Sequence, residues 1–152
     1  ARARGDDIVC VFNFDMIAWP GGSWGVRLVG VEAARRFVQY EAQIASTYTG
    51  LGHSESYRSF PSDSRSFDNV GYAATSGYEY GSEPYVWYHT SHDSLYRLSM
   101  PLAAEVTRMA VATLASLAVA PVGPAGFELS DCGNGSSAPN VSRRSATPSR
   151  PA

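Results

Sequence analysis

This chain of 152 residues is poor in charged residues. Charged side chains make up 17% of the sequence and leave a net charge of −2, whereas about a quarter of the residues in an ordinary globular protein are charged. Nucleic acids and anionic membranes are bound through clusters of basic side chains. We therefore expect neither as a partner.

The sequence also lacks a long apolar run and a recognisable leader. Its most apolar helical stretch, residues 109–120, is too short and too rich in Ala and Thr to cross a bilayer. The chain opens with ARARGDD, without an initiator methionine, and passes directly into a predicted strand. No secretory signal has this form, and the abrupt start suggests that the true N-terminus is missing.

Cysteine is scarce as well, since Cys10 and Cys132 are the only two. Cys10 lies in an apolar run and is expected to pack as a small hydrophobe. Cys132 lies in a polar tail, so we do not expect a stable bridge between them. Two cysteines form no disulfide framework and do not indicate a compartment.

Hydrophobic patterns predict strands and helices in the order of an α/β protein. Residues 8–14 (IVCVFNF) are typical of a strand buried on both faces, and residues 25–31 of a second strand. Residues 32–48 repeat apolar side chains at spacings of three and four, which predicts an amphipathic helix. Such a succession favours an α/β layer over a β-sandwich.

The rest of the chain is expected to contain more loop. Residues 49–66 are polar and patternless and predict a long loop, residues 67–71 a helix end stopped by Gly71, residues 72–75 a short strand and residues 77–84 a second loop. Pro101, preceded by Ser99 as a cap, opens a final helix whose apolar stripe reaches Leu114 and Leu117. We assign residues 1–120 to one domain and residues 121–152 to a disordered Pro/Ser/Gly-rich tail.

Two segments carry candidate chemistry. Asp15 closes the first strand, and ligand sites of open α/β sheets lie beyond the carboxyl ends of strands; a capping or turn role is the alternative. In Tyr88-His89-Thr90-Ser91-His92-Asp93, an imidazole can bind metal while the nearby acid supports the turn. For His92 we favour an exposed loop residue without metal contact.

Together these segments resemble the di-zinc aminopeptidases of the bacterial leucyl-aminopeptidase type. The resemblance covers about residues 7–117 and rests on three motifs in the right order: Asn13-Phe14-Asp15-Met16, Ser62-Asp63-x-x-x-Phe67-x-x-x-Gly71-Tyr72-x-Ala74, and Tyr88-His89-Thr90-x-x-Asp93. It implies a partial three-layer α/β/α fold with a mixed sheet.

The resemblance also implies roles for individual residues. Asp15 and His89 match ligands of two different zinc ions, which polarise a peptide carbonyl and activate water near neutral pH. Tyr88 matches a hydroxyl that stabilises the tetrahedral intermediate by about 3 kcal/mol, although simple aromatic packing is its alternative role. Asp93 and Asp63 are expected to order the loops behind the ligands.

The family's remaining ligands, a His-x-Asp pair and a Glu-Glu pair, are absent before Asp15. The chain therefore resembles the C-terminal part of a zinc-dependent exopeptidase that removes N-terminal residues from peptides. Its expected partners are a peptide substrate and the missing N-terminal half of the same domain, and it is expected to be inactive alone.

Two other functions stay open on the sequence. Ser64 stands where the family usually has His, which is compatible with a catalytically inactive scaffold or receptor ectodomain. A glutaminyl cyclase-like single-zinc transferase shares the aromatic-His-Thr segment, but Ser64 counts against it. The family's habits, with the sequons at Asn134 and Asn140, favour a secreted or vacuolar location.

Overall fold

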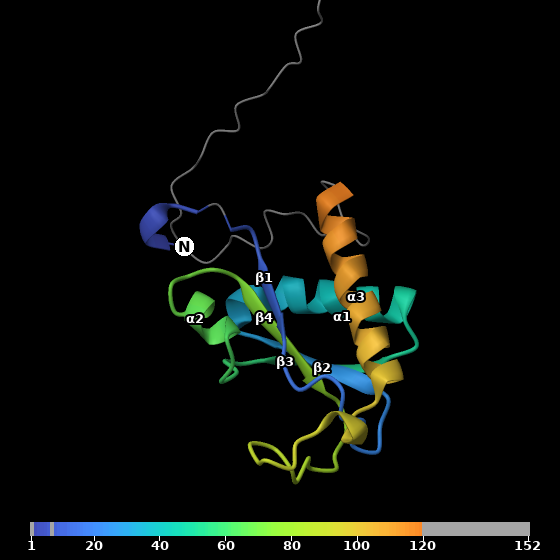
Figure 1. The fold of residues 1–152 in the computed structure, drawn as a ribbon. Helices are drawn as coiled ribbons and strands as arrows, with labels where there is room; N and C mark the ends of the chain where they lie inside the picture. Colours follow the sequence, from blue (N-terminus) through green and yellow to red (C-terminus); the bar gives the residue numbers. More distant parts are fainter. Residues whose placement is uncertain (1, 7, 120–152) are drawn as a thin grey trace, which may run out of the picture.

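The computed structural model describes residues 2–6 and 8–119. Its centre is a mixed sheet of four strands in the order β1 (Val11–Phe14), β4 (Ala74–Glu79), β2 (Gly25–Gly30) and β3 (Gly52–Tyr57). β1 runs parallel to β4 and β2 parallel to β3, while β2 and β4 are antiparallel. The carboxyl ends of β1 and β4 therefore lie at the same end of the sheet (Figure 1).

Helices cover both faces of this sheet. The helical elements are η1 (Arg2–Arg4), η2 (Glu32–Ala34), α1 (Arg35–Tyr48), α2 (Ser64–Asp68), η3 (Leu95–Arg97) and α3 (Met100–Val119). α1 contacts β2 and β3, α3 contacts β2, and the two helices contact each other. Adjacent strand residues point to opposite faces: Thr75 meets Glu41 of α1, whereas Ser76 bonds Ser64 of α2. The result is the expected α/β/α layering with a mixed sheet.

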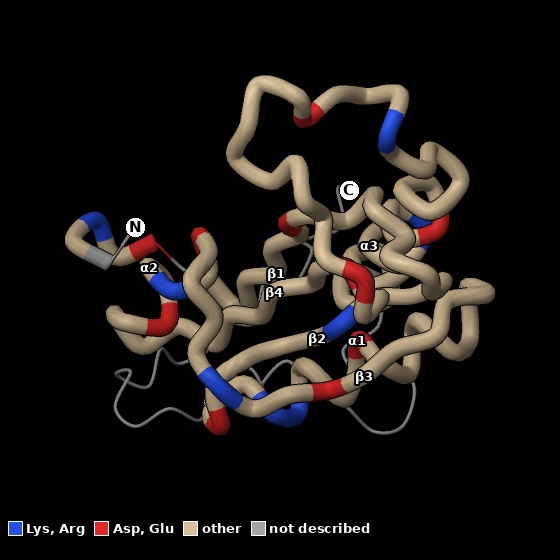
Figure 2. Tube along the Cα trace, turned by 90° about the horizontal axis from the view of Figure 1, so that it is seen from below, with Lys and Arg blue, Asp and Glu red and all other residues tan. Residues whose placement is uncertain are grey.

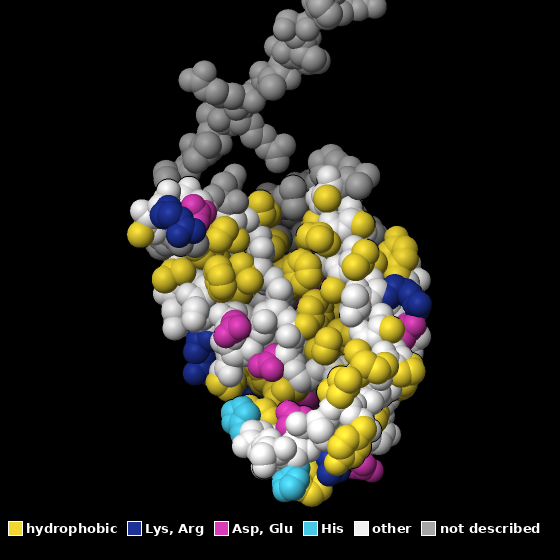
Figure 3. Space-filling view, viewed as in Figure 1, with side chains coloured by type: hydrophobic (Ala, Val, Ile, Leu, Met, Phe, Trp, Pro, Cys, Tyr) yellow, Lys and Arg dark blue, Asp and Glu magenta, His cyan; other side chains and the backbone are white. Residues whose placement is uncertain are grey.

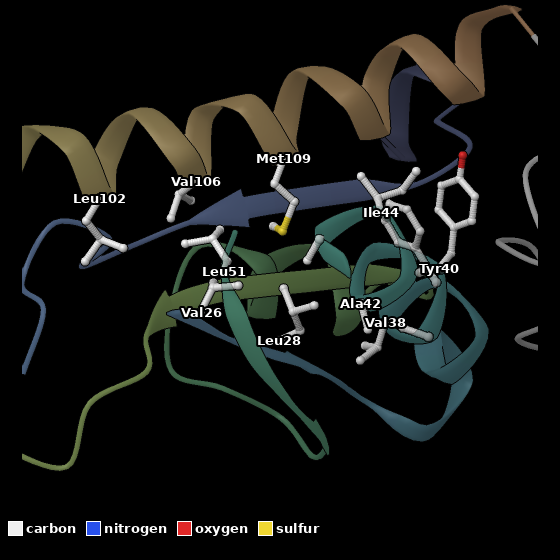
Figure 4. Packing of buried hydrophobic residues seen from close by; sticks show 14 residues of the cluster. Val26, Leu28, Val38, Tyr40, Ala42, Ile44, Leu51, Leu102, Val106 and Met109 are labelled. Carbon is white, nitrogen blue, oxygen red and sulfur yellow. The ribbon is translucent and has the colours of Figure 1, made fainter. Parts of the chain in front are cut away.

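The core lies between the sheet, α1 and α3. Leu102, Val106 and Met109 of α3 are fully buried and point towards Val26 and Leu28 of β2 (Figure 4). Fully burying such a side chain contributes about 1.5–3 kcal/mol to folding. The apolar stripe predicted for the last helix is therefore real, except that Leu114 is 58% exposed.

Two residues predicted to end or to cap a helix do so in the structure. Gly71 has a φ of +86° and ends the turn that follows α2, because its amide donates to the carbonyl of Asp68. Ser99 caps α3, since its Oγ accepts a hydrogen bond of 3.3 Å from the amide of Leu102.

Several predicted boundaries are wrong. The first strand is only half-buried and four residues long, because β1 is an edge strand with a neighbour on one side. The predicted loop 49–66 contains β3, whose polar sequence GHSESY suits the opposite sheet edge. The predicted loop 77–84 begins later than expected, because β4 continues to Glu79 in its pairing with β2.

The expectation that Cys10 would not form a bridge is also wrong. Cys10 is disulfide-bonded, and no free cysteine occurs among the described residues. The only other cysteine of the sequence, Cys132, lies outside the described residues, as do both sequons and the whole predicted tail, residues 121–152. Within the described part, no helix is long and apolar enough to cross a membrane.

Candidate functional site

Asp15 is held firmly at the carboxyl end of β1. Its amide donates to the carbonyl of Gly77 at 2.9 Å, which extends the pairing with β4. Asn13 Nδ2 donates to Ser62 Oγ at 2.7 Å, and this hydroxyl donates to Asp15 Oδ2 at 2.9 Å. Because the Asn13 amide fills an acceptor position of Ser62, the single hydroxyl proton is directed at the carboxylate. The arrangement fixes one oxygen of Asp15.

Glu79 ends the neighbouring strand β4 and was not identified from the sequence. Its amide donates to the carbonyl of Met16 at 2.9 Å, which places it beside the residue that follows Asp15. Its Oε2 is buried without a hydrogen-bond partner. Burial raises the pKa of Glu79, and the Asp15 carboxylate raises it further. A lone Glu at a strand end carries no pattern, so sequence reasoning had no signal for it.

Two residues that are not glycine have a left-handed backbone among the described residues. They are Met16, with a φ of 54°, and His89, with a φ of 56°. This conformation is costly for residues with a Cβ, and it gathers at functional sites, where surrounding contacts impose it. Both lie in the segments predicted to carry zinc ligands.

The two loops that carry these segments are fastened to each other. The loop after β1 (residues 15–24) and the loop after β4 (residues 80–99) meet through three hydrogen bonds: Trp19 Nε1 to the Glu83 carbonyl at 3.1 Å, the Glu83 amide to the Gly21 carbonyl at 3.2 Å, and the Ser99 amide to the Ala18 carbonyl at 2.8 Å. The structure thus brings the loops of Asp15 and His89 together beyond the carboxyl ends of β1 and β4 (Figure 1).

His89 is exposed on the second loop. Its ring stacks on the Tyr88 ring with centroids 3.8 Å apart and an interplanar angle of 20°. Tyr88 is itself 50% exposed, so its side chain is not packed in the core. His92 instead packs edge-on against Trp87 at 5.3 Å, and its carbonyl accepts a hydrogen bond from Arg97. The two histidines have different surroundings.

The two acids predicted to order loops differ in their contacts. Asp93 accepts a hydrogen bond of 2.6 Å from the Tyr85 hydroxyl across the turn that contains His89, and this bond raises the pKa of Tyr85. Asp63 is exposed and forms no side-chain cap on α2. In its segment the neighbouring Ser62 is the residue that contacts Asp15.

The donor types at this edge suit zinc, which binds imidazole nitrogen and carboxylate oxygen. The buried Oε2 of Glu79, beside Asp15, has no hydrogen-bond partner and is an acceptor that a further group could use. However, no three His, Cys, Asp or Glu side chains of the described residues lie close enough together to hold a metal ion.

Acidic and histidine side chains gather at the lower end of the face seen in Figure 3. Charged residues of both signs are scattered along the described trace (Figure 2).

Comparison with known proteins places this geometry in a family. The model of peptidase family M28 matches residues 1–114. Among solved structures, the LapA aminopeptidase of Legionella pneumophila is similar, with a TM-score of 0.65 at 19% sequence identity. The match covers 74% of this chain but only 31% of that one. No curated protein matches the sequence.

Proposed function

This chain belongs to peptidase family M28, and from that premise we propose that it forms the C-terminal part of a zinc-dependent aminopeptidase. The observation that carries the proposal is the junction of the two loops beyond β1 and β4. It joins the segment of Asp15 to the segment of His89 beyond the carboxyl ends of the strands, where α/β proteins bind ligands.

In this proposal Asp15 and His89 are ligands of two different zinc ions. Asp15 and His89 would hold these ions, whose chemistry when bound would be to polarise the scissile carbonyl and to activate water near neutral pH. The chain's own residues prepare the site: Ser62 fixes Asp15 Oδ2, and the tight turn at His89 presents its imidazole on the surface of the loop. Asp93 orders that loop through Tyr85.

We propose that the Tyr88 hydroxyl donates a hydrogen bond to the oxyanion of the tetrahedral intermediate. Its partial exposure and its stacking on His89 support this role. A donor aimed at developing charge contributes about 3 kcal/mol to the transition state. On this basis Tyr88→Phe should lower kcat by about 100-fold and change KM little.

We further propose that the remaining ligands come from polypeptide outside these residues and that the chain alone does not hydrolyse peptides. The absence of a three-donor cluster among the described residues supports this. The chain also spans less than a third of the LapA structure.

The function is tested with protein that contains this chain together with the rest of its family domain. Hydrolysis of leucine p-nitroanilide should be lost after treatment with a zinc chelator and return when zinc is added. Hydrolysis that persists without metal would contradict the zinc mechanism. If zinc is bound but no amino-terminal arylamide or peptide is cleaved, the chain belongs to an inactive scaffold.

The compartment proposed for this protein is an oxidising one, either secreted or vacuolar. The disulfide of Cys10 supports it, because cytosolic proteins rarely keep structural disulfides. Protein isolated from its natural source under alkylating conditions should therefore expose no free thiol at Cys10. Full alkylation of Cys10 before reduction would contradict this compartment.

A further inference from the structure

Cys10 packs against the core just before β1 and is part of a disulfide. Side chains alternate between the two faces of a strand, so Cys10 shares its face with Phe12, whose ring meets Phe37 of α1 edge-on at 6.2 Å. The structure contains a single chain, and Cys132 is the only other cysteine of its sequence. Within one chain, Cys132 is therefore the cysteine available to pair with Cys10.

The last turns of α3 lie at the same end of the molecule as Cys10. In Figures 1 and 4, β1 starts at the end of the sheet where α3 finishes. α3 ends at Val119, so residues 120–131 are all that separate it from Cys132. A stretch of this length reaches across about 40 Å when it is extended. It is long enough to return from the end of α3 to the start of β1.

The surface between these two points is apolar and only partly covered. Four side chains pack against the core cluster but keep part of their surface exposed: Cys10, Phe12, Ala112 and Leu117. We call this surface the β1–α3 seam, and Figure 3 shows apolar side chains along it. Removing apolar surface from water is favourable, so the seam suits an apolar segment.

The sequence after α3 changes in composition at Cys132. Between α3 and Cys132 lie the large apolar residues Val122, Phe127 and Leu129, whereas Val141 is the only one after Cys132. A segment that packs on an apolar surface needs apolar side chains of its own, and a segment without them stays solvated. The composition therefore favours residues 120–131 as the part that covers the seam.

We propose that Cys10 pairs with Cys132 and that residues 120–131 lie as a strap along the β1–α3 seam. The strap holds the start of β1, the strand that Asp15 follows. The two thiols form one disulfide by losing two protons and two electrons, which reduce the disulfide of an oxidoreductase to two thiols. The tail predicted to be disordered would then begin after Cys132. This proposal goes beyond the peptidase function and depends on neither zinc nor hydrolysis.

A second copy of this chain is the competing partner for Cys10. Cys10 of one copy could bond Cys10 or Cys132 of another. The pair within one chain is favoured, because a tether of only residues 120–131 keeps Cys132 near the folded core. Such a tether gives Cys132 a far higher effective concentration at Cys10 than a separate molecule has.

Disulfide mapping tests the pairing. The protein used contains this chain together with the rest of its family domain and is produced in an oxidising compartment. Trypsin cuts after arginine and should release residues 5–27, which contain Cys10, joined to residues 109–143, which contain Cys132. A free thiol in residues 5–27, or a bond from them to their own copy or to any other polypeptide, would overturn the proposal. So would the expected pair if it occurred only in a dimer.

Hydroxyl-radical labelling of side chains in the same protein tests where the strap lies. Cys132→Ser releases the strap, so labelling of Leu117 should rise at least about twofold as its contacts with the strap are lost. Leu114 is the internal control, because it is a leucine of the same helix that is already 58% exposed. In a variant that folds by circular dichroism, unchanged labelling of Leu117 or an equal rise at Leu114 would overturn the strap.

A second pair of variants keeps the disulfide and decides the matter if Cys132→Ser does not fold. Phe127→Ser removes the largest apolar side chain of the strap, and Val141→Ser is the matched control beyond Cys132. Phe127→Ser should raise the labelling of Leu117 at least about twofold while residues 5–27 and 109–143 stay joined. Val141→Ser should leave the labelling unchanged. Equal labelling of Leu117 in the two variants would show that the segment does not cover the seam.

Discussion

Glu41 is a carboxylic acid in the interior of the protein. It lies on α1 with 1% of its surface exposed, and its Oε2 has no hydrogen-bond partner. Burial raises its pKa to about 8, although Thr75 opposes the shift. At neutral pH the folded protein therefore holds Glu41 mainly protonated, which avoids an unpaired buried charge.

The pH dependence of stability follows from this residue. The unfolded chain releases the Glu41 proton near pH 4.5, whereas the folded chain keeps it to about pH 8. Between these values the free energy of unfolding should fall by about 1.4 kcal/mol per pH unit, and Glu41 adds no further change above pH 8. Urea unfolding of Glu41→Gln from pH 5 to 8 should show this slope removed.

The matched control for that series is Glu32→Gln, since Glu32 is exposed and paired with Arg35. It should leave the slope in place. A slope of the same size in Glu41→Gln would show that Glu41 is not the group responsible.

Ser62 tests how Asp15 is positioned. Ser62→Ala removes the hydrogen bond to Oδ2 while keeping the chain fold, and loss of such a supporting contact costs about 10–100-fold in metal affinity. Zinc titration of the completed domain by calorimetry should show this loss. Ser59→Ala is the control, because Ser59 is exposed and its hydroxyl accepts a hydrogen bond of 3.2 Å from Arg65, away from Asp15. Equal affinities of the two variants would contradict the role of Ser62.

At the scale of elements, the junction of the two site loops depends on glycine. A Cβ on Gly81 would lie 2.1 Å from the carbonyl oxygen of Gly21, which is too close for any side chain. Gly81→Ala must push the loops apart, and such overpacking costs about 1–3 kcal/mol. Thermal unfolding should detect the loss, and hydrolysis by the completed domain should fall with it.

Gly50→Ala is the control for that substitution, because a Cβ there meets nothing within 4 Å. If Gly81→Ala were as stable and as active as Gly50→Ala, the loops would not need their close approach.

The elements show how much of the fold the sequence could predict. Helices α1 and α3 were predicted because a buried apolar stripe imposes its period on the sequence. β3 was missed because an edge strand is held by backbone pairing with β2, and its polar side chains show no apolar alternation. The end of β4 was missed for the same reason, since its partner β2 determines where it stops.

The candidate site was predictable only in part. Asp15 and His89 were found through motifs, and the structure joins their loops through backbone contacts between residues 18–21 and residues 83–99. Such contacts depend on tertiary structure and leave no local pattern. Glu79 lies beside Asp15 for the same reason, because β1 and β4 pair in parallel.

At the scale of the whole molecule, this chain has its own core, and the zinc site proposed for it needs donors from outside the described residues. α1, α3 and the sheet bury a continuous apolar cluster, whereas the described residues gather no three metal donors. The chain belongs to peptidase family M28, and its match covers 31% of the LapA chain. Both findings support the proposal that other polypeptide completes the domain.

The most direct test of the account is the zinc content of the completed domain after dialysis, measured by mass spectrometry. We expect two zinc ions per molecule, with one lost in Asp15→Asn and one in His89→Ala, and hydrolysis abolished in both. His92→Ala should keep both ions and its activity, because the His92 ring packs against Trp87 and is not one of the proposed ligands. Full zinc content in His89→Ala, or equal losses in His89→Ala and His92→Ala, would contradict the assignment of Asp15 and His89 to a zinc pair.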